Sequence, residues 1–349
     1  MKKSNFIRSV IFFLLTAVLL LGLCNMFEHE NDHIRERFNT YDDMAKNTVD
    51  VTFIGTSGMD RYWIAARGFE ESGITAYPFT SEATPVWLYI STLKQATKNQ
   101  SPKLVIFDMR PFLRSYEKNN ISDTASRKVI DSLDFFSFSR FDAINRTLKV
   151  LSEYDEEISP YDPSYFFSFI KYHNMWENSM SFDELKDPKS DYLGFFIHKT
   201  LSVKSVDTIV ENQTTQEREP LDEICYSQLY ELLDYIEGAD YEVLFLDTAH
   251  TYDELELKRA NTLCDILKER NIKYVMNPLD SDMYDFEKDF YNERHVNYYG
   301  AEKFTTWFQQ YLLENYDLPD RRDDENCKSW YGAYDVIKAK IAELEKKAK

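Results

Sequence analysis

The sequence has few cysteines and few histidines, and their spacing is not that of the common metal sites. The four cysteines form no CxxC pair, and none lies at zinc-site spacing from a histidine. The six histidines are scattered without an HxH or HExxH pattern, and the acidic stretch DSDMYDFEKD lacks the glycine of a calcium loop. We therefore expect no metal, no other cofactor and no disulfide framework; a single Cys225–Cys327 bond stays open.

Positive charge is also scarce. The chain has 41 Lys and Arg against 60 Asp and Glu, a formal net charge of −19, and no basic stripe interrupts this balance. Such a chain repels a phosphate backbone, so we expect no nucleic-acid partner. Apolar residues, in contrast, make up 43% of the 349 residues and include 25 Phe and 24 Tyr, which is enough to fill a large α/β core.

One long apolar run stands near the N-terminus, where lysines and an arginine precede or flank IFFLLTAVLLLGLCNMF. Its length is close to the ~20 residues that a helix needs to cross a bilayer, so we expect a transmembrane anchor over residues 9–27. The basic start and the acidic segment EHENDH behind the run place residues 1–8 in the cytoplasm by the positive-inside rule. The remainder is then extracytoplasmic, on a single-pass protein of the plasma membrane.

A cleaved signal peptide is the alternative interpretation of this run, because its charged start and apolar core look similar. No A-x-A-like site follows the run, and the bulky Leu23 before Cys24 disfavours lipoprotein cleavage. These features favour an anchor that is retained.

Short apolar runs rich in β-branched residues alternate with helical patterns in the rest of the chain. Runs of this kind are typical of strands buried on both faces, and five are present: VTFIG at 51–55, ITAYPF at 74–79, KLVIFDM at 103–109, YEVLFLDT at 241–248 and IKYVMN at 272–277. Helical patterns cover roughly 85–98, 220–237, 255–270 and a segment from about Tyr299. The alternation predicts a three-layer α/β/α sandwich with a five-stranded parallel sheet and a ligand crevice at the carboxyl ends of the strands.

A long insertion separates the third and fourth predicted strands. It covers about 111–219 and is dense in aromatic residues, as in FFSFSRF and PSYFFSFIKYH. We expect helices that pack over the sheet edge as a lid or substrate wall, or that use these aromatics as a core of their own. The extracytoplasmic domain would span 28–335, and helical spacing of apolar residues predicts an amphipathic helix over 330–349.

Two segments carry the residues of a serine hydrolase. Ser57 lies in the turn IGTSGM after the first strand, where Gly58 and neighbouring backbone N–H groups can stabilise an oxyanion. His295 lies in FYNERHVNYYG, between the last strand and the last main helix, and is therefore expected at the same edge of the sheet. A histidine within hydrogen-bonding reach of a serine can take its proton and produce the nucleophile. The alternative interpretation is that Ser57 is an ordinary residue of a strand-to-helix turn and that His295 has only a structural role.

GTSG after the first strand and NERHVNYYGAEKFT near the end resemble the first and last blocks of SGNH/GDSL-type hydrolases. The stretches AYPFTSEATPVWLYISTLKQATKNQSPKLVIFDM, FIKYHNMWENSMSFDEL and HVNYYGAEKFTTWFQQYLLENYDLPD resemble membrane-anchored SGNH-like proteins of Gram-positive bacteria. Those proteins are similar to D-alanyl-lipoteichoic-acid biosynthesis esterases and polysaccharide O-acetyltransferases. The resemblance covers most of residues 45–335 and implies an SGNH-like fold with esterase or O-acyltransferase activity.

The sequence departs from this family at three places. The acid three residues before the histidine is Asn292, and in serine proteases the comparable Asp-to-Asn change lowers kcat by about 10⁴. Thr80 and Ala83 stand where related sequences tend to have the glycines of an oxyanion loop. The family's block-three asparagine has no clear equivalent, and the polar residue near the third strand is Asp108, which follows a buried apolar run and is expected to open toward the crevice. We therefore expect weakened activity.

Other polar residues near strand ends could orient the imidazole or line the crevice, although each is also compatible with a loop or capping role. They are Asp247 and His250 after the fourth strand, and Asp289, Glu293 and Asn297 around the histidine.

These features predict ester hydrolysis or O-acyl transfer on surface polymers, with Ser57 as nucleophile and His295 as general base. The expected partner is a cell-envelope polymer or acylated glycan. The main alternative is a catalytically inactive SGNH-like protein that binds glycan or a membrane-bound O-acyltransferase. A third is an anchored scaffold that uses its aromatic insertion.

Overall fold

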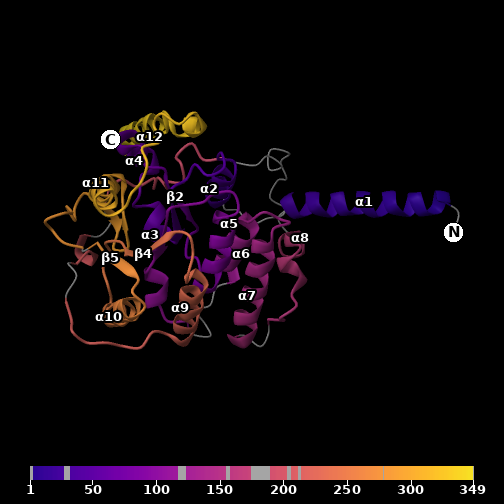
Figure 1. The fold of residues 1–349 in the computed structure, drawn as a ribbon, viewed down its shortest axis with the longest axis horizontal. Helices are drawn as coiled ribbons and strands as arrows, with labels where there is room; N and C mark the ends of the chain where they lie inside the picture. The colour runs from indigo at the N-terminus through magenta and orange to yellow at the C-terminus, as the bar shows by residue number, and fades with distance from the viewer. Residues whose placement is uncertain are drawn as a thin grey trace.

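The chain, drawn in Figure 1 as a computed structural model, folds around a five-stranded parallel sheet. The structure describes residues 3–26, 32–116, 123–154, 158–173, 189–202, 206–210, 214–277 and 279–348, so residues 28–31 and most of the 169–185 segment lie outside it. The strands follow the order β2 (Ala76–Thr80), β1 (Val51–Gly55), β3 (Leu104–Asp108), β4 (Glu242–Asp247) and β5 (Lys273–Met276). The predicted fold class and all five predicted strands are confirmed.

The apolar runs form strands because the sheet is covered on both faces. Every residue of β1, β2 and β3 is buried, which explains why these runs do not alternate between apolar and polar residues. The edge strand β5 is partly exposed along its whole length. All five carboxyl ends lie at the same edge because the pairing is parallel throughout.

Helices cover the sheet in two layers. On one face lie α4 (Ala65–Ser72) and α11 (Tyr298–Asn315), which contact each other, and on the other lie α5 (Tyr89–Ala96), α9 (Glu223–Ile236) and α10 (Glu254–Glu269). Aromatic rings fill the space between layers: the Phe53 ring of β1 lies 6.1 Å from Phe308 of α11. The predicted C-terminal amphipathic helix is α12 (Ala333–Ala348), which packs on α4 above α11 in Figure 1 and buries Ile337 and Ile341.

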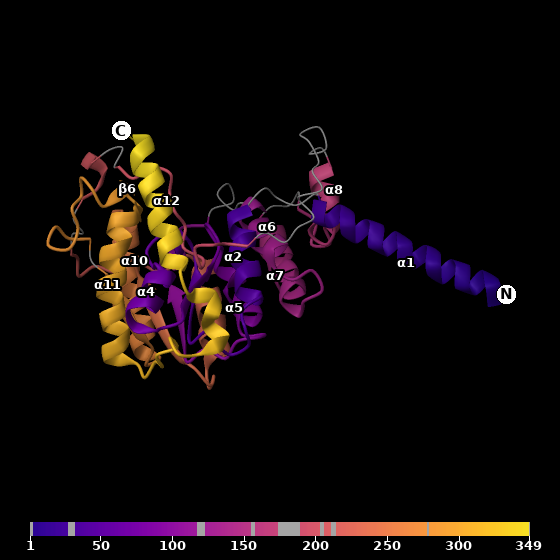
Figure 2. The same cartoon turned by 90° about the horizontal axis from the view of Figure 1, so that it is seen from above.

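The described residues of the insertion after β3 form short 3-10 segments and the helices α6 (Asp123–Ser132), α7 (Phe138–Tyr154) and α8 (Ser168–Tyr172). Helix α7 packs on α5, and α6 packs on α2 (Asp32–Asp42), so this group extends the domain sideways rather than covering the middle of the sheet. Figures 1 and 2 both show α6, α7 and α8 on the side of the domain from which α1 departs.

The N-terminal helix α1 (Lys3–Met26) projects away from the domain. Its stretch Asn5–Cys24 has 20 residues and a mean hydropathy of 2.4, and its most apolar window is unburied. By length and composition this helix can cross a membrane, and a signal sequence shares the same features. All four cysteines are buried free thiols, so the Cys225–Cys327 bond is not formed.

Candidate functional site

Ser57 and His295 meet at the carboxyl edge of the sheet. Ser57 opens the short helix α3 (Ser57–Asp60) directly behind β1, and His295 opens β7 (His295–Val296), which pairs with β6 (Phe290–Asn292). The Ser57 Oγ atom lies 2.8 Å from His295 Nε2 although 238 positions separate the two residues. Both side chains are partly exposed, so a ligand can reach them. This is the geometry of a serine nucleophile with its base.

Asn292 lies against the other ring nitrogen of His295. Its Oδ1 atom lies 3.1 Å from His295 Nδ1 and also accepts the backbone N–H of Arg294 at 2.9 Å. A backbone N–H can only donate, so the amide oxygen, and not its nitrogen, faces the ring. The proton of the neutral imidazole therefore lies on Nδ1, which leaves the lone pair of Nε2 directed at Ser57. Asn292 preserves the tautomer that a general base needs, but it supplies no negative charge.

The surroundings of His295 disfavour its protonated form. Burial lowers the pKa of His295 well below its ordinary value, and the positive charges of Arg61, Arg110 and Arg294 lower it further. An aspartate at position 292 would offset part of this effect. In its absence the imidazole is neutral at physiological pH but is a weak base.

Asp108 is fully buried beneath the nucleophile turn rather than open to the crevice as expected. Its carboxylate accepts the backbone N–H of Thr56 at 3.0 Å, the Thr56 hydroxyl and the N–H of Arg110 at 3.0 Å. Gly55 and Gly58 permit this close approach, because a Cβ on Gly55 would collide with the Asp108 side chain and one on Gly58 would lie 3.0 Å from Oδ2. Asp108 thus holds the strand-to-helix turn that presents Ser57.

Arg110 connects the turn after β4 with the loop that carries the histidine. Its guanidinium donates to the carbonyl oxygens of Thr248 at 2.9 Å and Arg294 at 2.9 Å, the latter one residue before His295. Asp247 lies 3.7 Å from the Arg110 Nε atom. Arg110 was not predicted from the sequence, although its place two residues after a strand-end aspartate marks it as a side chain of this edge.

Asp247 and His250 lie in the same buried cluster and make no hydrogen bond to the His295 imidazole. Burial raises the pKa of Asp247 to about 7, and its carboxylate accepts the hydroxyl of Tyr252. His250 Nδ1 lies 2.8 Å from the Thr248 carbonyl oxygen, and burial keeps the pKa of this histidine well below its ordinary value. The open crevice positions expected for these two residues are wrong: both are at most 1% exposed.

Thr80 also faces inward. Its hydroxyl donates to Asp60 at 3.0 Å, and its carbonyl oxygen accepts from Arg37 at 2.8 Å. Asp60 and Arg37 form a buried ion pair at 3.0 Å that ties α2 to the nucleophile helix. Ala83 in the following loop has a φ of 55°, a left-handed conformation that favours glycine, so the loop retains a glycine-like backbone.

Asp289 and Asn297 are buried and stabilise the segment around His295 through contacts that do not involve the imidazole. Asp289 accepts the Lys303 ammonium at 2.5 Å and the backbone N–H of Asp285 at 2.7 Å. Asn297 caps α11 by accepting the N–H of Tyr299 at 2.9 Å. Neither side chain hydrogen-bonds to the imidazole, whose Nδ1 partner is Asn292.

Arg61 is a second arginine of this site that the sequence did not predict. Its Nη1 atom lies 3.2 Å from His295 Nε2, and its Nη2 atom donates to Glu82. Since Nε2 has one lone pair, the guanidinium competes with the Ser57 hydroxyl for it. The four-residue spacing between Ser57 and Arg61 places both on one helical turn, which is a signal that the sequence contains.

Aromatic rings form a wall beside Arg61. The guanidinium carbon lies 4.5 Å from the ring centre of Phe196 and 5.8 Å from that of Tyr291. Tyr291 is parallel to His295 at 5.5 Å and to His198 at 3.9 Å. Phe196 and His198 belong to the predicted insertion 111–219, so a non-helical part of it lies beside the site, whereas its helices α6 and α7 pack on α2 and α5.

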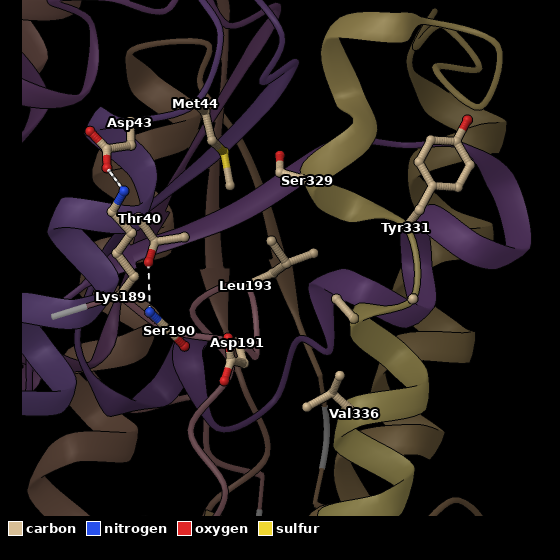
Figure 3. Close-up of a pocket in the computed structure, with 12 residues that line it drawn as sticks. Thr40, Asp43, Met44, Lys189, Ser190, Asp191, Leu193, Ser329, Tyr331 and Val336 are labelled. Atoms are coloured by element: carbon tan, nitrogen blue, oxygen red, sulfur yellow. Dashed lines mark hydrogen bonds and ion pairs between the residues drawn. The ribbon is translucent and has the colours of Figure 1, made fainter.

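A separate groove of about 580 Å³ lies away from this site, between α2, residues 189–193 and the start of α12. Figure 3 shows Met44, Leu193 and Val336 turned into it, and Thr40 accepting the backbone N–H of Ser190 at 2.7 Å. Neither Ser57 nor His295 lines this groove, so the groove is not part of the site that these two residues form.

The described residues contain no group of three or more His, Cys, Asp or Glu side chains that could hold a metal ion. A comparison with protein-family models finds no match, and a search of curated proteins finds none. The chemistry of the chain therefore has to be inferred from the contact between Ser57 and His295 and from its neighbours.

Proposed function

We propose that this protein is a weakly active serine esterase or O-acyltransferase of SGNH type that acts on an ester-bearing cell-envelope polymer or glycan. The 2.8 Å contact between Ser57 Oγ and His295 Nε2 carries the proposal. Two further observations support it: the domain has the five-stranded parallel sheet that the resemblance to SGNH/GDSL-type hydrolases implies, and the serine follows its first strand.

The reaction begins when Ser57 Oγ attacks the acyl carbon and its proton passes to His295 Nε2. The backbone N–H of Ser57, at the first position of α3, can donate to the resulting oxyanion, whereas the Gly58 N–H donates to Thr56 Oγ1 at 3.3 Å. Collapse of the intermediate breaks the ester C–O bond, and the leaving alcohol takes the proton from Nε2. Water or a second alcohol then attacks the acyl-serine, which completes hydrolysis or transfer.

The location follows from α1, which we propose is retained as a single transmembrane anchor. Its C-terminal end packs on the insertion: the Ser168 hydroxyl donates to the Cys24 carbonyl oxygen at 2.7 Å, and Cys24 is buried. A signal peptide that is removed does not require such contacts with the mature domain. The charge asymmetry of the flanks then puts the catalytic domain on the extracytoplasmic side.

A second function, binding without catalysis, is favoured by the contact between Arg61 and His295. The 3.2 Å contact occupies the lone pair that must accept the serine proton, and a protonated Nε2 would face the guanidinium charge. In this case the crevice binds glycan or a membrane-bound O-acyltransferase partner and Ser57 is not acylated.

Labelling with a fluorophosphonate probe separates the two functions. The full-length protein in detergent is treated with the probe, and the adduct is assigned by mass spectrometry. We expect slow labelling at Ser57 that is lost in Ser57→Ala and His295→Ala.

His198→Ala is the matched control, because this histidine stacks on Tyr291 at the same wall. It should retain labelling. If neither the wild type nor Asn292→Asp reacts while both are folded, the catalytic proposal fails and binding is the function that stands.

A further inference from the structure

Residues 136–170 of the insertion, in α7, α8 and the segments beside them, include several exposed aromatic side chains and one exposed isoleucine. We define the aromatic patch by six residues that are 38% to 92% exposed: Phe136, Phe138, Phe141, Tyr161, Phe167 and Ile170. Within the described part of the chain, every exposed phenylalanine outside α1 belongs to this patch. Single exposed apolar residues are ordinary, but a cluster of this kind marks an interaction surface.

Two members of the patch make ring contacts with the segment in and beside α8. The Phe141 ring of α7 lies 6.0 Å from Phe166, and the Phe167 ring lies 6.1 Å from Phe169 of α8. Helix α8 also receives the end of α1 through the 2.7 Å hydrogen bond from Ser168 to Cys24. The exposed aromatics therefore begin where the apolar helix ends, as Figures 1 and 2 show for the elements concerned.

We propose that the aromatic patch lies in the bilayer interface and docks the domain on the lipid surface. This inference rests on the anchor in the proposed function and is independent of catalysis. If Asn5–Cys24 crosses the bilayer, Cys24 lies at its outer boundary, and α8 with the neighbouring end of α7 lies at the same level. Aromatic side chains at that depth bury their rings among the lipid headgroups and upper acyl chains.

A lipid surface fits this patch better than a second protein because the bilayer is already placed there by α1. The polar neighbours agree: Lys171 follows Ile170 and is exposed, with its ammonium 3.2 Å from Asp123, so its stem can lie along the interface while its charge stays in water.

Docking would also orient the catalytic site. Lys128 of α6 forms an ion pair with Glu82 at 3.5 Å, and Glu82 holds Arg61 beside His295. The insertion thus connects the patch with the crevice through side chains, and a docked patch holds Ser57 at a constant distance from the membrane. A polymer attached to the same membrane could then present its ester groups to a fixed site.

The test places nitroxide labels on the full-length protein in nanodiscs of equal parts phosphatidylglycerol and phosphatidylcholine. Phe138→Cys and Tyr161→Cys report on the patch, Leu15→Cys reports on α1, and Tyr226→Cys on α9 is the matched exposed control. The native thiols are buried and the patch residues are largely exposed, so labelling is selective and folding should be retained. We expect both patch labels to be accessible to oxygen and shielded from a water-soluble nickel complex, unlike Tyr226.

Three other results of this experiment would each contradict either the docking proposal or the anchor. If Leu15 is shielded but both patch labels are as accessible to nickel as Tyr226, the docking proposal is wrong and the anchor stands. If Leu15 is also accessible, the anchor fails and docking fails with it. If the patch labels are shielded in detergent and show a short dipolar distance between molecules, a second copy of the chain covers the patch instead of lipid.

Discussion

Restoring an acid at position 292 is the change that tests the site most directly. In Asn292→Asp a carboxylate replaces the amide oxygen 3.1 Å from His295 Nδ1. Two unit charges ~4 Å apart at an effective dielectric constant of ~20 attract by about 4 kcal/mol, and desolvation of the new carboxylate offsets roughly half of this. The remaining ~2 kcal/mol corresponds to about a 30-fold faster acylation.

This gain is smaller than the factor of about 10⁴ that separates aspartate from asparagine in serine proteases. There the amide enforces the wrong tautomer. Here the backbone N–H of Arg294 holds the Asn292 oxygen toward the ring, so the correct tautomer is already present and only the charge is missing.

The assay is the second-order rate of fluorophosphonate labelling between pH 6 and 9, with Ser57→Ala as background and Asn292→Ala as control. The alanine variant loses the Nδ1 acceptor and should react more slowly than the wild type. The new carboxylate should raise the pKa of His295, so the acid limb of the profile should move to higher pH in Asn292→Asp. A rate that falls in Asn292→Asp and is unchanged in Asn292→Ala would show that Asn292 does not orient the base.

Three further changes test the surrounding residues. Arg61→Met should raise the pKa of His295, seen in its NMR titration, and speed labelling several-fold, because it removes the nearest positive charge and the competing donor; an unchanged pKa would contradict this. Burial raises the pKa of Asp247 to about 7, above ~3.9 in the unfolded chain, so the folded state binds more protons between about pH 4 and 7 and this group destabilises it as pH rises. Asp247→Asn should therefore gain stability relative to the wild type from pH 5 to 8 in urea unfolding, and a pH-independent difference would refute the shift. Gly300→Ala should lower the free energy of unfolding by about 3 kcal/mol in the same measurement and slow labelling, because its Cβ would collide with the Asp289 carbonyl oxygen beside the His295 loop. A urea midpoint equal to that of the wild type would show that the loop can move to accommodate the methyl group.

Local pattern was enough to predict the sheet. Runs such as 51–55 and 103–109 do not alternate between apolar and polar residues, because the strands within them are buried between two helical layers. A strand buried on both faces can therefore be predicted from the sequence. The alternation of strands and helices along the chain also predicts that Ser57 and His295 lie at the same edge of the sheet. Chain connectivity determines such placements, since parallel strands bring all their carboxyl ends to one side.

The sequence alone therefore determined the fold class, the apolar N-terminal helix and the pair Ser57 and His295. Only the tertiary structure decided what surrounds them: it directs the Asn292 oxygen toward the imidazole, brings Arg61 to Nε2 and buries Asp108 under the nucleophile turn. The physical reason is that strands and helices arise from short-range periodicity, whereas the direction of a polar side chain depends on donors and acceptors from distant segments. A strand-end aspartate looks the same in sequence whether it opens to solvent or lies fully buried.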